Sequence, residues 1–233
     1  MATGIIRFGL TRDNRLATFI YLRLLTQKLA DSPPWTANDV RCFSTEYERD
    51  PKTDGDLFKI ACDRFDDIKH DVEKSDNSLR EELRAGDDEF AFRRFLARKL
   101  NERSRQRYTV PQEEEIDLRQ RPDLRMENPK TAPVSIEVKW ADKWTLAELL
   151  ERLESQLVGQ YLRANGSRHG IYILGTFGRK GYWEESASGR RLAFEEVVDI
   201  IRRRASELES ARSDVSGIDV VSVDFRDPRV RST

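Results

Sequence analysis

Residues 134–140 read Val-Ser-Ile-Glu-Val-Lys-Trp, and this stretch is the strongest fold signal in the chain. Its alternation of apolar and polar side chains predicts a β-strand, because successive side chains of a strand point to opposite faces of a sheet. One face then carries the apolar side chains of Ile136, Val138 and Trp140. Glu137 and Lys139 project together from the other face, where two ions without a role would be costly.

A shorter strand is predicted upstream, at residues 114–119, where Asp117 lies between Ile116 and Leu118. If the two strands are neighbours in one sheet, Asp117, Glu137 and Lys139 converge on a single patch. Carboxylate oxygens select Mg²⁺ or Mn²⁺, which keep several waters and accept phosphate oxygens of a substrate. Such a metal activates a bound water and neutralises charge on the phosphate, while a lysine orients the attacking water or helps to deprotonate it.

The pattern around these strands predicts an α/β fold in two parts. Apolar residues of helical period and turn-forming Pro, Asp and Gly predict a helical accessory region over residues 1–86, with a boundary near Gly86. For residues 87–233 we expect an alternation of helices and strands. The expected helices cover residues 87–103, 145–163 and 192–208, and the expected strands cover residues 107–110, 114–119, 134–140, 170–176 and 218–223.

The arrangement of Asp117, nineteen intervening residues and then Glu137-Val138-Lys139, within this order of elements, resembles the PD-(D/E)xK nuclease superfamily. The resemblance covers about residues 87–223 and implies a restriction-endonuclease-like core. It implies that Asp117 and Glu137 bind Mg²⁺, with Mn²⁺ as a substitute, that the carbonyl group of Val138 joins the coordination sphere, and that Lys139 serves the attacking water. Some members add an acidic residue from the first core helix, which makes Glu89 a further candidate ligand.

Two details of this chain depart from the family pattern. Many members carry Gln-x-x-x-Tyr on the helix after the lysine strand, whereas this chain reads Gln156-Leu-Val-Gly-Gln160-Tyr161. The resemblance therefore implies a site role for Gln156 or Gln160 and leaves open which of them, with Tyr161, takes it. The family motif also begins with a Pro-Asp pair, and here Ile116 precedes Asp117.

Charge is balanced over the chain but separated along it. Forty-one Lys and Arg residues against 42 Asp and Glu residues give a formal charge of −1, which excludes a uniformly basic nucleic-acid coat. Residues 63–89 are rich in acids, and residues 90–110 hold seven basic residues against one glutamate. This basic segment is either a solvated helix face paired with its acidic neighbour or a stripe that follows phosphates. Under the second interpretation, the residues expected to bind nucleic acid are Arg93, Arg94, Lys99 and Tyr161.

Several other classes of protein are excluded by sequence. No uninterrupted apolar stretch reaches the roughly 18 residues of a membrane helix, and no secretory signal is present, so we expect a cytoplasmic protein that does not enter a membrane. Cys42 and Cys62 are too few for a metal knuckle, and the two histidines lack ligand spacing, so no zinc site is implied. The glycines near residue 178 lack the following Lys-Ser or Lys-Thr of a P-loop.

The sequence thus predicts a Mg²⁺-dependent nuclease that hydrolyses phosphodiester bonds in nucleic acid. Family precedent favours DNA, and the chain resembles nuclease modules attached to large bacterial proteins of defence or repair systems. Residues 1–86 would dock this module onto a partner protein or a second copy of the chain. The alternative is a catalytically silent nuclease-like fold that binds nucleic acid or acts as a scaffold. A purely helical interaction domain is disfavoured by the strands expected after Arg107.

Overall fold

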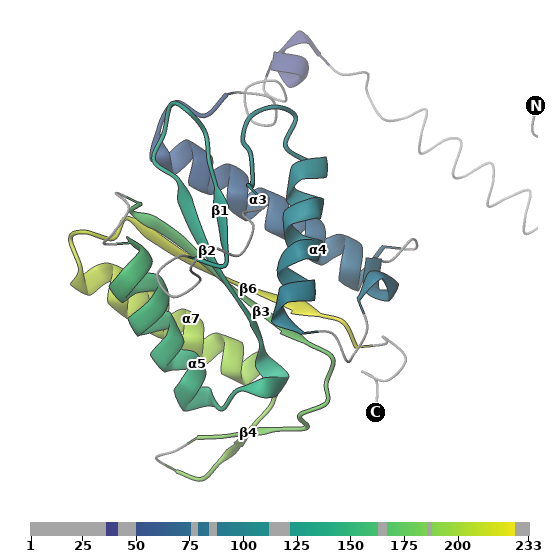
Figure 1. The fold of residues 1–233 in the computed structure, drawn as a ribbon, viewed down its shortest axis with the longest axis vertical. Coiled ribbons are helices and arrows are strands. Elements are labelled where there is room, and N and C mark those ends of the chain that lie inside the picture. The colour runs from purple at the N-terminus through teal and green to yellow at the C-terminus, as the bar shows by residue number, and fades with distance from the viewer. Residues whose placement is uncertain are drawn as a thin grey trace, which may run out of the picture. The chain divides into compact units, whose positions relative to one another are not determined.

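The computed structural model describes residues 36–41, 50–75, 79–83, 88–111, 122–162, 167–185 and 188–226. The chain divides into two compact units, residues 1–49 and 50–233, and all elements named below belong to the second (Figure 1). The boundary expected near Gly86 falls inside this second unit, because the helix Asp54–Glu73 (α3) packs on the sheet that later residues form. The strand expected at residues 114–119, and Asp117 with it, lies outside the described residues.

A mixed four-stranded sheet forms the centre of the second unit, in the order β1-β2-β3-β6. Its strands are Leu124–Met126 (β1), Val134–Trp140 (β2), His169–Thr176 (β3) and Gly217–Asp224 (β6). β1 is antiparallel to β2, whereas β2, β3 and β6 are parallel. The prediction of an α/β fold is confirmed, including the strands at 134–140, 170–176 and 218–223.

The region between the first helix and β2 differs from expectation. Residues 107–110 contribute only an isolated bridge from Thr109 to Glu127. The segment between the strands expected at residues 114–119 and 134–140 contains β1, whose three residues are too few to show an alternating pattern.

Helices cover both faces of the sheet (Figure 1). One face is covered by α3 and by Glu89–Glu102 (α4), and the other by Leu146–Arg152 (α5), the π-helix Leu153–Tyr161 (η4) and Phe194–Ala211 (α7). Every residue of β2 and β3 is buried. The alternation in β2 separates the two layers as predicted, with Ile136, Val138 and Trp140 in the core beneath α3 and α4.

The helices that carry predicted site residues begin at side-chain caps. The carboxylate of Asp88 accepts a hydrogen bond from the Ala91 amide (2.8 Å) at the start of α4. Thr145 and Glu148 form a capping box at the start of α5. Both caps satisfy amide groups that have no partner within the first helical turn. They confirm the predicted starts of these two helices.

The start of α4 lies close to the sheet because β3 has a glycine there. A Cβ atom at Gly175 would lie 2.5 Å from the Trp140 side chain and 2.6 Å from that of Phe92. Those two rings stack with their centroids 4.2 Å apart. A larger residue at position 175 would therefore push Phe92, and with it the first turn of α4, away from β2.

The outer edge of β6 is closed by side chains. Lys69 donates to the Ser222 carbonyl group, Arg202 donates to that of Val220 (3.2 Å), and Glu73 accepts from the Asp224 amide (2.9 Å). These bonds use backbone groups that would otherwise be open to pairing with another strand. The edge of the sheet is therefore unsuited to strand addition.

Three short elements complete the second unit. A hairpin of Trp183–Glu184 (β4) and Arg191–Leu192 (β5) follows β3. The 3₁₀ helix Leu79–Glu82 (η1) lies beside α4, and the 3₁₀ helix Ala141–Lys143 (η3) directly follows β2 in the chain. Within the described residues, none of the helices has the length and apolar character needed to cross a membrane.

Candidate functional site

Lys139 lies among three carboxylates that come from three different elements. Its ammonium nitrogen is 2.6 Å from Glu137 Oε1, 3.5 Å from Asp123 Oδ2 and 3.8 Å from Glu89 Oε2. The lysine side chain is only 7% exposed. We call Glu89, Asp123, Glu137 and Lys139 the carboxylate cluster. The structure therefore brings together the predicted Glu89, Glu137 and Lys139, and adds an acid that sequence reasoning missed.

Asp123 is that additional acid, and the pairing of β1 with β2 fixes its place. Leu124 lies opposite Ile136 in an antiparallel register, so the residue before Leu124 reaches the next part of β2. There Asp123 Oδ2 accepts a hydrogen bond from the Val138 amide (2.8 Å), and Oδ1 accepts one from Arg93 (3.0 Å). Asp123 thus occupies the position beside Glu137 that the sequence prediction gave to Asp117.

The sequence held a signal for Asp123 that the prediction passed over. Pro122 and Asp123 form a Pro-Asp pair, with thirteen residues between Asp123 and Glu137. Proline and aspartate are both common in turns, so the pair by itself does not indicate a site. The search for an acid inside an alternating strand instead selected Asp117, whose role stays a prediction because it lies outside the described residues.

Glu137 is the most deeply buried acid of the cluster, at 1% exposure. Burial, and then the negative charge of Asp123, raise its pKa to about 7 against the opposing effect of Lys139. Its Oε2 atom is buried and accepts no hydrogen bond from the described residues. An unpartnered carboxylate oxygen in such a place is costly, and it is available to bind a cation or a proton.

Lys139 keeps its charge in this environment. Burial lowers its pKa, but the nearby carboxylates of Glu137, Asp123 and Glu89 outweigh burial, so that the pKa is raised overall. The side chain also donates to the Val138 carbonyl group (3.2 Å). A lysine held in the charged form is suited to orienting a water and to offsetting negative charge, and is poorly suited to accepting a proton.

Glu89 is held by two tryptophans. Its Oε1 accepts hydrogen bonds from the Trp144 indole (2.7 Å) and from the Trp140 amide (3.4 Å). Glu89 is also the first residue of α4, where the helix dipole favours a negative charge. These contacts orient Oε2 toward Lys139. Glu89 therefore belongs to the cluster, while its role as a metal ligand stays a prediction.

Gln156 links Glu137 to Arg152. In the amide orientation that satisfies both neighbours, Gln156 donates to Glu137 Oε1 (2.7 Å) and accepts from Arg152 (2.9 Å). The Arg152 guanidinium lies 5.3 Å from the centre of the Trp144 ring. Gln160 is half-buried one turn further along η4. The sequence left open which glutamine reaches the cluster, and in the structure Gln156 does.

The π-helical geometry of η4 accounts for the extra residue between Gln156 and Tyr161. A π-helix bonds residues five apart, so positions i and i+5 lie about where i and i+4 lie in an α-helix. Tyr161 is 4% exposed, and burial together with the charges of Glu137 and Asp123 raises its pKa. Tyr161 is therefore buried close to the cluster and does not form part of an exposed nucleic-acid-binding surface.

The basic residues of α4 fall into two groups. Lys99 pairs with Glu82 (2.8 Å) and Glu102 (3.4 Å), and its side chain is only 10% exposed. Arg98 pairs with the same two glutamates, and Arg103 pairs with Asp71 (2.5 Å). The cations in the last turn of α4 and at its cap thus form an ion network. This agrees with the interpretation of the basic segment as a helix face paired with its acidic neighbour.

Arg93 and Arg94, nearer the start of α4, belong to the second group. Arg93 binds Asp123 and Arg94 is exposed. Both guanidinium groups lie near the ring of Phe90, at 5.5 and 5.6 Å from its centre. Of the α4 residues predicted to bind nucleic acid, Arg93 binds an acid of the cluster, Arg94 lies near Phe90, and Lys99 is held in the ion network.

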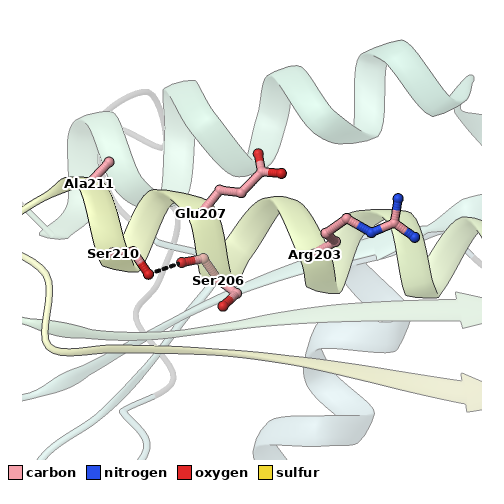
Figure 2. A pocket seen from close by; sticks show the side chains of 5 residues that line it. All are labelled: Arg203, Ser206, Glu207, Ser210 and Ala211. Carbon is pink, nitrogen blue, oxygen red and sulfur yellow. Dashed lines mark hydrogen bonds between the residues drawn. The ribbon is translucent and has the colours of Figure 1, made fainter.

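A surface hollow on α7 offers little chemistry (Figure 2). It is lined by Arg203, Ser206, Glu207, Ser210 and Ala211, all from one face of this helix. The Ser210 hydroxyl bonds the Ser206 carbonyl group (2.8 Å), a contact within the helix. In Figure 2 the charged side chains of Arg203 and Glu207 both extend outward from the helix and in the same direction. The hollow therefore lacks the converging polar groups of a catalytic site.

The chemistry of the cluster fits a hard divalent cation. In the described residues, no three His, Cys, Asp or Glu side chains are arranged as a metal site on their own, and the Lys139 ammonium group lies among the three carboxylates. The buried, unpartnered Oε2 of Glu137 is nevertheless a suitable ligand atom for Mg²⁺. A scan against protein-family models, a search of curated proteins and a search of solved structures each return no match.

Proposed function

We propose that the carboxylate cluster is the active centre of a Mg²⁺-dependent nuclease of the PD-(D/E)xK type. The observation that carries this proposal is that Pro122-Asp123, directly before β1, lies beside Glu137-Val138-Lys139 on the adjacent strand β2. The motif letters of that superfamily are thus matched in this chain, with Asp123 as the first acid. The position of Gln156 on the following helix, in contact with Glu137, is a second point of support.

Three groups would hold the metal: the carboxylates of Asp123 and Glu137 and the carbonyl group of Val138. All three supply the oxygen ligands that Mg²⁺ prefers. When bound, Mg²⁺ supplies an activated water and neutralises charge on a phosphate. The Val138 amide fixes the Asp123 carboxylate by a 2.8 Å hydrogen bond, so two of these groups are oriented by one peptide segment.

The remaining residues orient these ligands before substrate arrives. Gln156 holds Glu137 Oε1, and Arg93 holds Asp123 Oδ1. Lys139, kept charged by its neighbours, would position the attacking water and offset charge on the phosphate. Such neighbours typically account for about 10–100-fold in metal affinity or activity. DNA is favoured as the substrate by family resemblance, as is a place in a bacterial defence or repair system.

The test is cleavage of labelled plasmid and linear single-stranded DNA with Mg²⁺, Mn²⁺ or EDTA. The wild type should cut with metal and not with EDTA, and Lys139→Ala should abolish cutting. Lys143→Ala is the matched control, because Lys143 is an exposed lysine of η3 with no ion pair among the described residues. Nicking of closed circles would identify an endonuclease, and an inert wild type would contradict the proposal.

A catalytically silent fold that binds nucleic acid or acts as a scaffold remains the second candidate. One observation favours it: Lys139 lies within 4 Å of all three carboxylates and partly balances them without a metal. The same assay separates the two, because a silent fold would bind nucleic acid while leaving DNA and RNA uncut with every metal.

A further inference from the structure

Arginine side chains lie over two exposed aromatic rings of the second unit. Among the described residues of that unit, the exposed large hydrophobic side chains are Phe90 (42%) and Tyr182 (40%). Arg93 and Arg94 lie over Phe90, and the Arg191 guanidinium lies 4.2 Å from the centre of the Tyr182 ring. Exposed apolar rings beside cations are more typical of a binding surface than of a packed core.

Both rings are connected to the carboxylate cluster through Trp144. Phe90 directly follows Glu89, whose carboxylate accepts the Trp144 indole N–H (2.7 Å). Tyr182 lies between Lys180 and Trp183, which donate to the Trp144 carbonyl group at 2.7 and 3.1 Å. The segment that holds Phe90 therefore contacts the indole of Trp144, and the segment that holds Tyr182 contacts its backbone carbonyl group. The hairpin that follows Tyr182 (Figure 1) supplies Arg191.

Apart from Arg93, which pairs with Asp123, the arginines near these rings have no acidic partner among the described residues, unlike the cations at the end of α4. Arg94, Arg179 and Arg191 are exposed and form no ion pair with any other described residue. Arg179 lies three residues before Tyr182. Unpaired arginines attract phosphates, and exposed aromatic faces stack on nucleic-acid bases.

We propose that Phe90 and Tyr182 are base-stacking platforms and that the cluster acts on single-stranded nucleic acid. The second part rests on the proposed nuclease function and names its substrate class. In a duplex the faces of the bases are covered by their neighbours, whereas unpaired bases can be splayed out onto aromatic side chains. Both residues are at least 40% exposed, and a base would stack on the exposed part of each ring. Arg94, Arg179 and Arg191 contact the phosphates between the stacked bases.

The test is binding, measured by fluorescence anisotropy on the full chain in EDTA, where metal-dependent cleavage is absent. The probes are a labelled 20-nucleotide single strand and the duplex of the same sequence. The single strand should bind more tightly. Phe90→Ala and Tyr182→Ala should each weaken single-strand binding by roughly 5- to 100-fold, the range for loss of one stacked base. Duplex binding should change much less.

Controls separate stacking from folding and from general charge. Tyr182→Phe keeps the ring and should bind as the wild type does. Arg203→Ala removes an exposed arginine from α7 and should leave binding unchanged. Thermal unfolding of each variant checks that the fold is retained. Comparing single-stranded RNA with single-stranded DNA of the same sequence shows which of the two binds more tightly. Tighter binding of either single strand than of the duplex supports the proposal.

Two results would overturn the inference: equal or tighter binding of the duplex, or alanine variants that bind the single strand as the wild type does. Because binding is measured without metal, this result stands whether or not the chain cuts. Failure of the nuclease proposal would appear separately, as an inert wild type in the cleavage assay. A wild type that cuts only duplex DNA would leave the nuclease proposal intact and contradict the single-strand inference.

Discussion

Two clusters of ions lie at opposite ends of α4, and they differ in charge balance and in burial. At the C-terminal end, Arg98, Lys99 and Arg103 pair with Glu82, Glu102 and Asp71, so three cations meet three acids. At the N-terminal end, Lys139 and Arg93 meet three acids. The acids of the first cluster are 30–50% exposed, whereas those of the second are 2–24% exposed.

The difference shows how a site is distinguished from a structural ion network. Exposed ion pairs contribute about 0–1 kcal/mol each and tolerate change. The buried carboxylate cluster carries a surplus of acids, an unpartnered oxygen on Glu137 and a raised pKa, all of which oppose folding. Unfavourable electrostatics held in place by a rigid sheet therefore indicate function more strongly than a high density of charge does.

The largest expected effect is on catalysis at the buried cluster. Glu137→Gln removes a ligand charge while keeping the shape of the side chain. Loss of a metal-supported step worth several kcal/mol should reduce Mg²⁺-dependent cleavage by roughly 10³-fold. Initial rates on labelled DNA measure this, and Glu151→Gln, an exposed glutamate of α5, is the control. A Glu137→Gln variant that retains most of its rate would remove the distinction between the two clusters.

The same substitution should stabilise the fold when metal is absent. The pKa of Glu137 is raised from 4.5 to about 7 in the folded state, so its charged form destabilises the fold as pH rises through that interval. Glutamine does not ionise. The free energy of unfolding should therefore increase by about 1–3 kcal/mol above pH 7, and the gain should vanish below pH 4.5.

Urea unfolding in EDTA at pH 8 and pH 4.5 measures this difference. A loss of about 3–5 kcal/mol at pH 8 is the result expected for breaking a buried structural ion pair. That outcome would identify Glu137 and Lys139 as a buried structural ion pair, and the surplus of acids in the cluster would no longer indicate a site.

Substitutions in the ion network at the C-terminal end of α4 should have only small effects on stability. Arg98→Ala should lower the free energy of unfolding by less than about 1 kcal/mol and leave nucleic-acid affinity unchanged. Arg94→Ala removes a cation without an acidic partner, so it should weaken nucleic-acid binding several-fold and reduce the salt dependence by about one counterion. Anisotropy titrations at several salt concentrations compare the two variants. Equal losses in affinity would mean that the whole basic face of α4 follows phosphates.

The smallest effect concerns His169, which lies outside both clusters. Burial lowers the pKa of His169 below 6.5, and its ring lies 4.8 Å from that of Phe58. The unfolded chain then binds a proton more readily than the folded one, so stability should fall as pH drops below 6.5. His169→Phe keeps a ring and removes this pH dependence. Between pH 7.5 and 5.5 we expect His169 to change the free energy of unfolding by less than about 1 kcal/mol. Identical pH profiles for the two proteins would exclude this effect.

Local patterns in the sequence predicted most of the sheet and the helices at its site. Alternation identified β2, and apolar runs identified β3 and β6, because strands of seven or eight residues show their pattern clearly. The starts predicted at residues 87 and 145 lie within two residues of the observed starts of α4 and α5. The side of β2 that carries Glu137 and Lys139 followed from the period of two alone.

The remaining features depend on contacts between distant residues. Asp123 reaches Val138 through the register of β1 on β2, which no local pattern encodes. The period of α3 showed an amphipathic helix but not that Leu57 and Phe65 would pack in the core of the sheet unit. The π-helical register of Gln156 and Tyr161 is likewise a property of the folded helix. Tertiary packing therefore decides that α3 joins the sheet unit and that Asp123 lies beside Glu137.

We propose that Asp123 completes a metal site with Glu137, beside Lys139. The sharpest test compares Mn²⁺ binding by calorimetry, at pH 8, for the wild type, Asp123→Asn and Asp117→Asn. We expect one bound ion in the wild type and a loss of affinity in Asp123→Asn that is at least ten times the loss in Asp117→Asn. Unchanged Mn²⁺ binding in Asp123→Asn, or a loss confined to Asp117→Asn, would show that Asp123 is not a ligand.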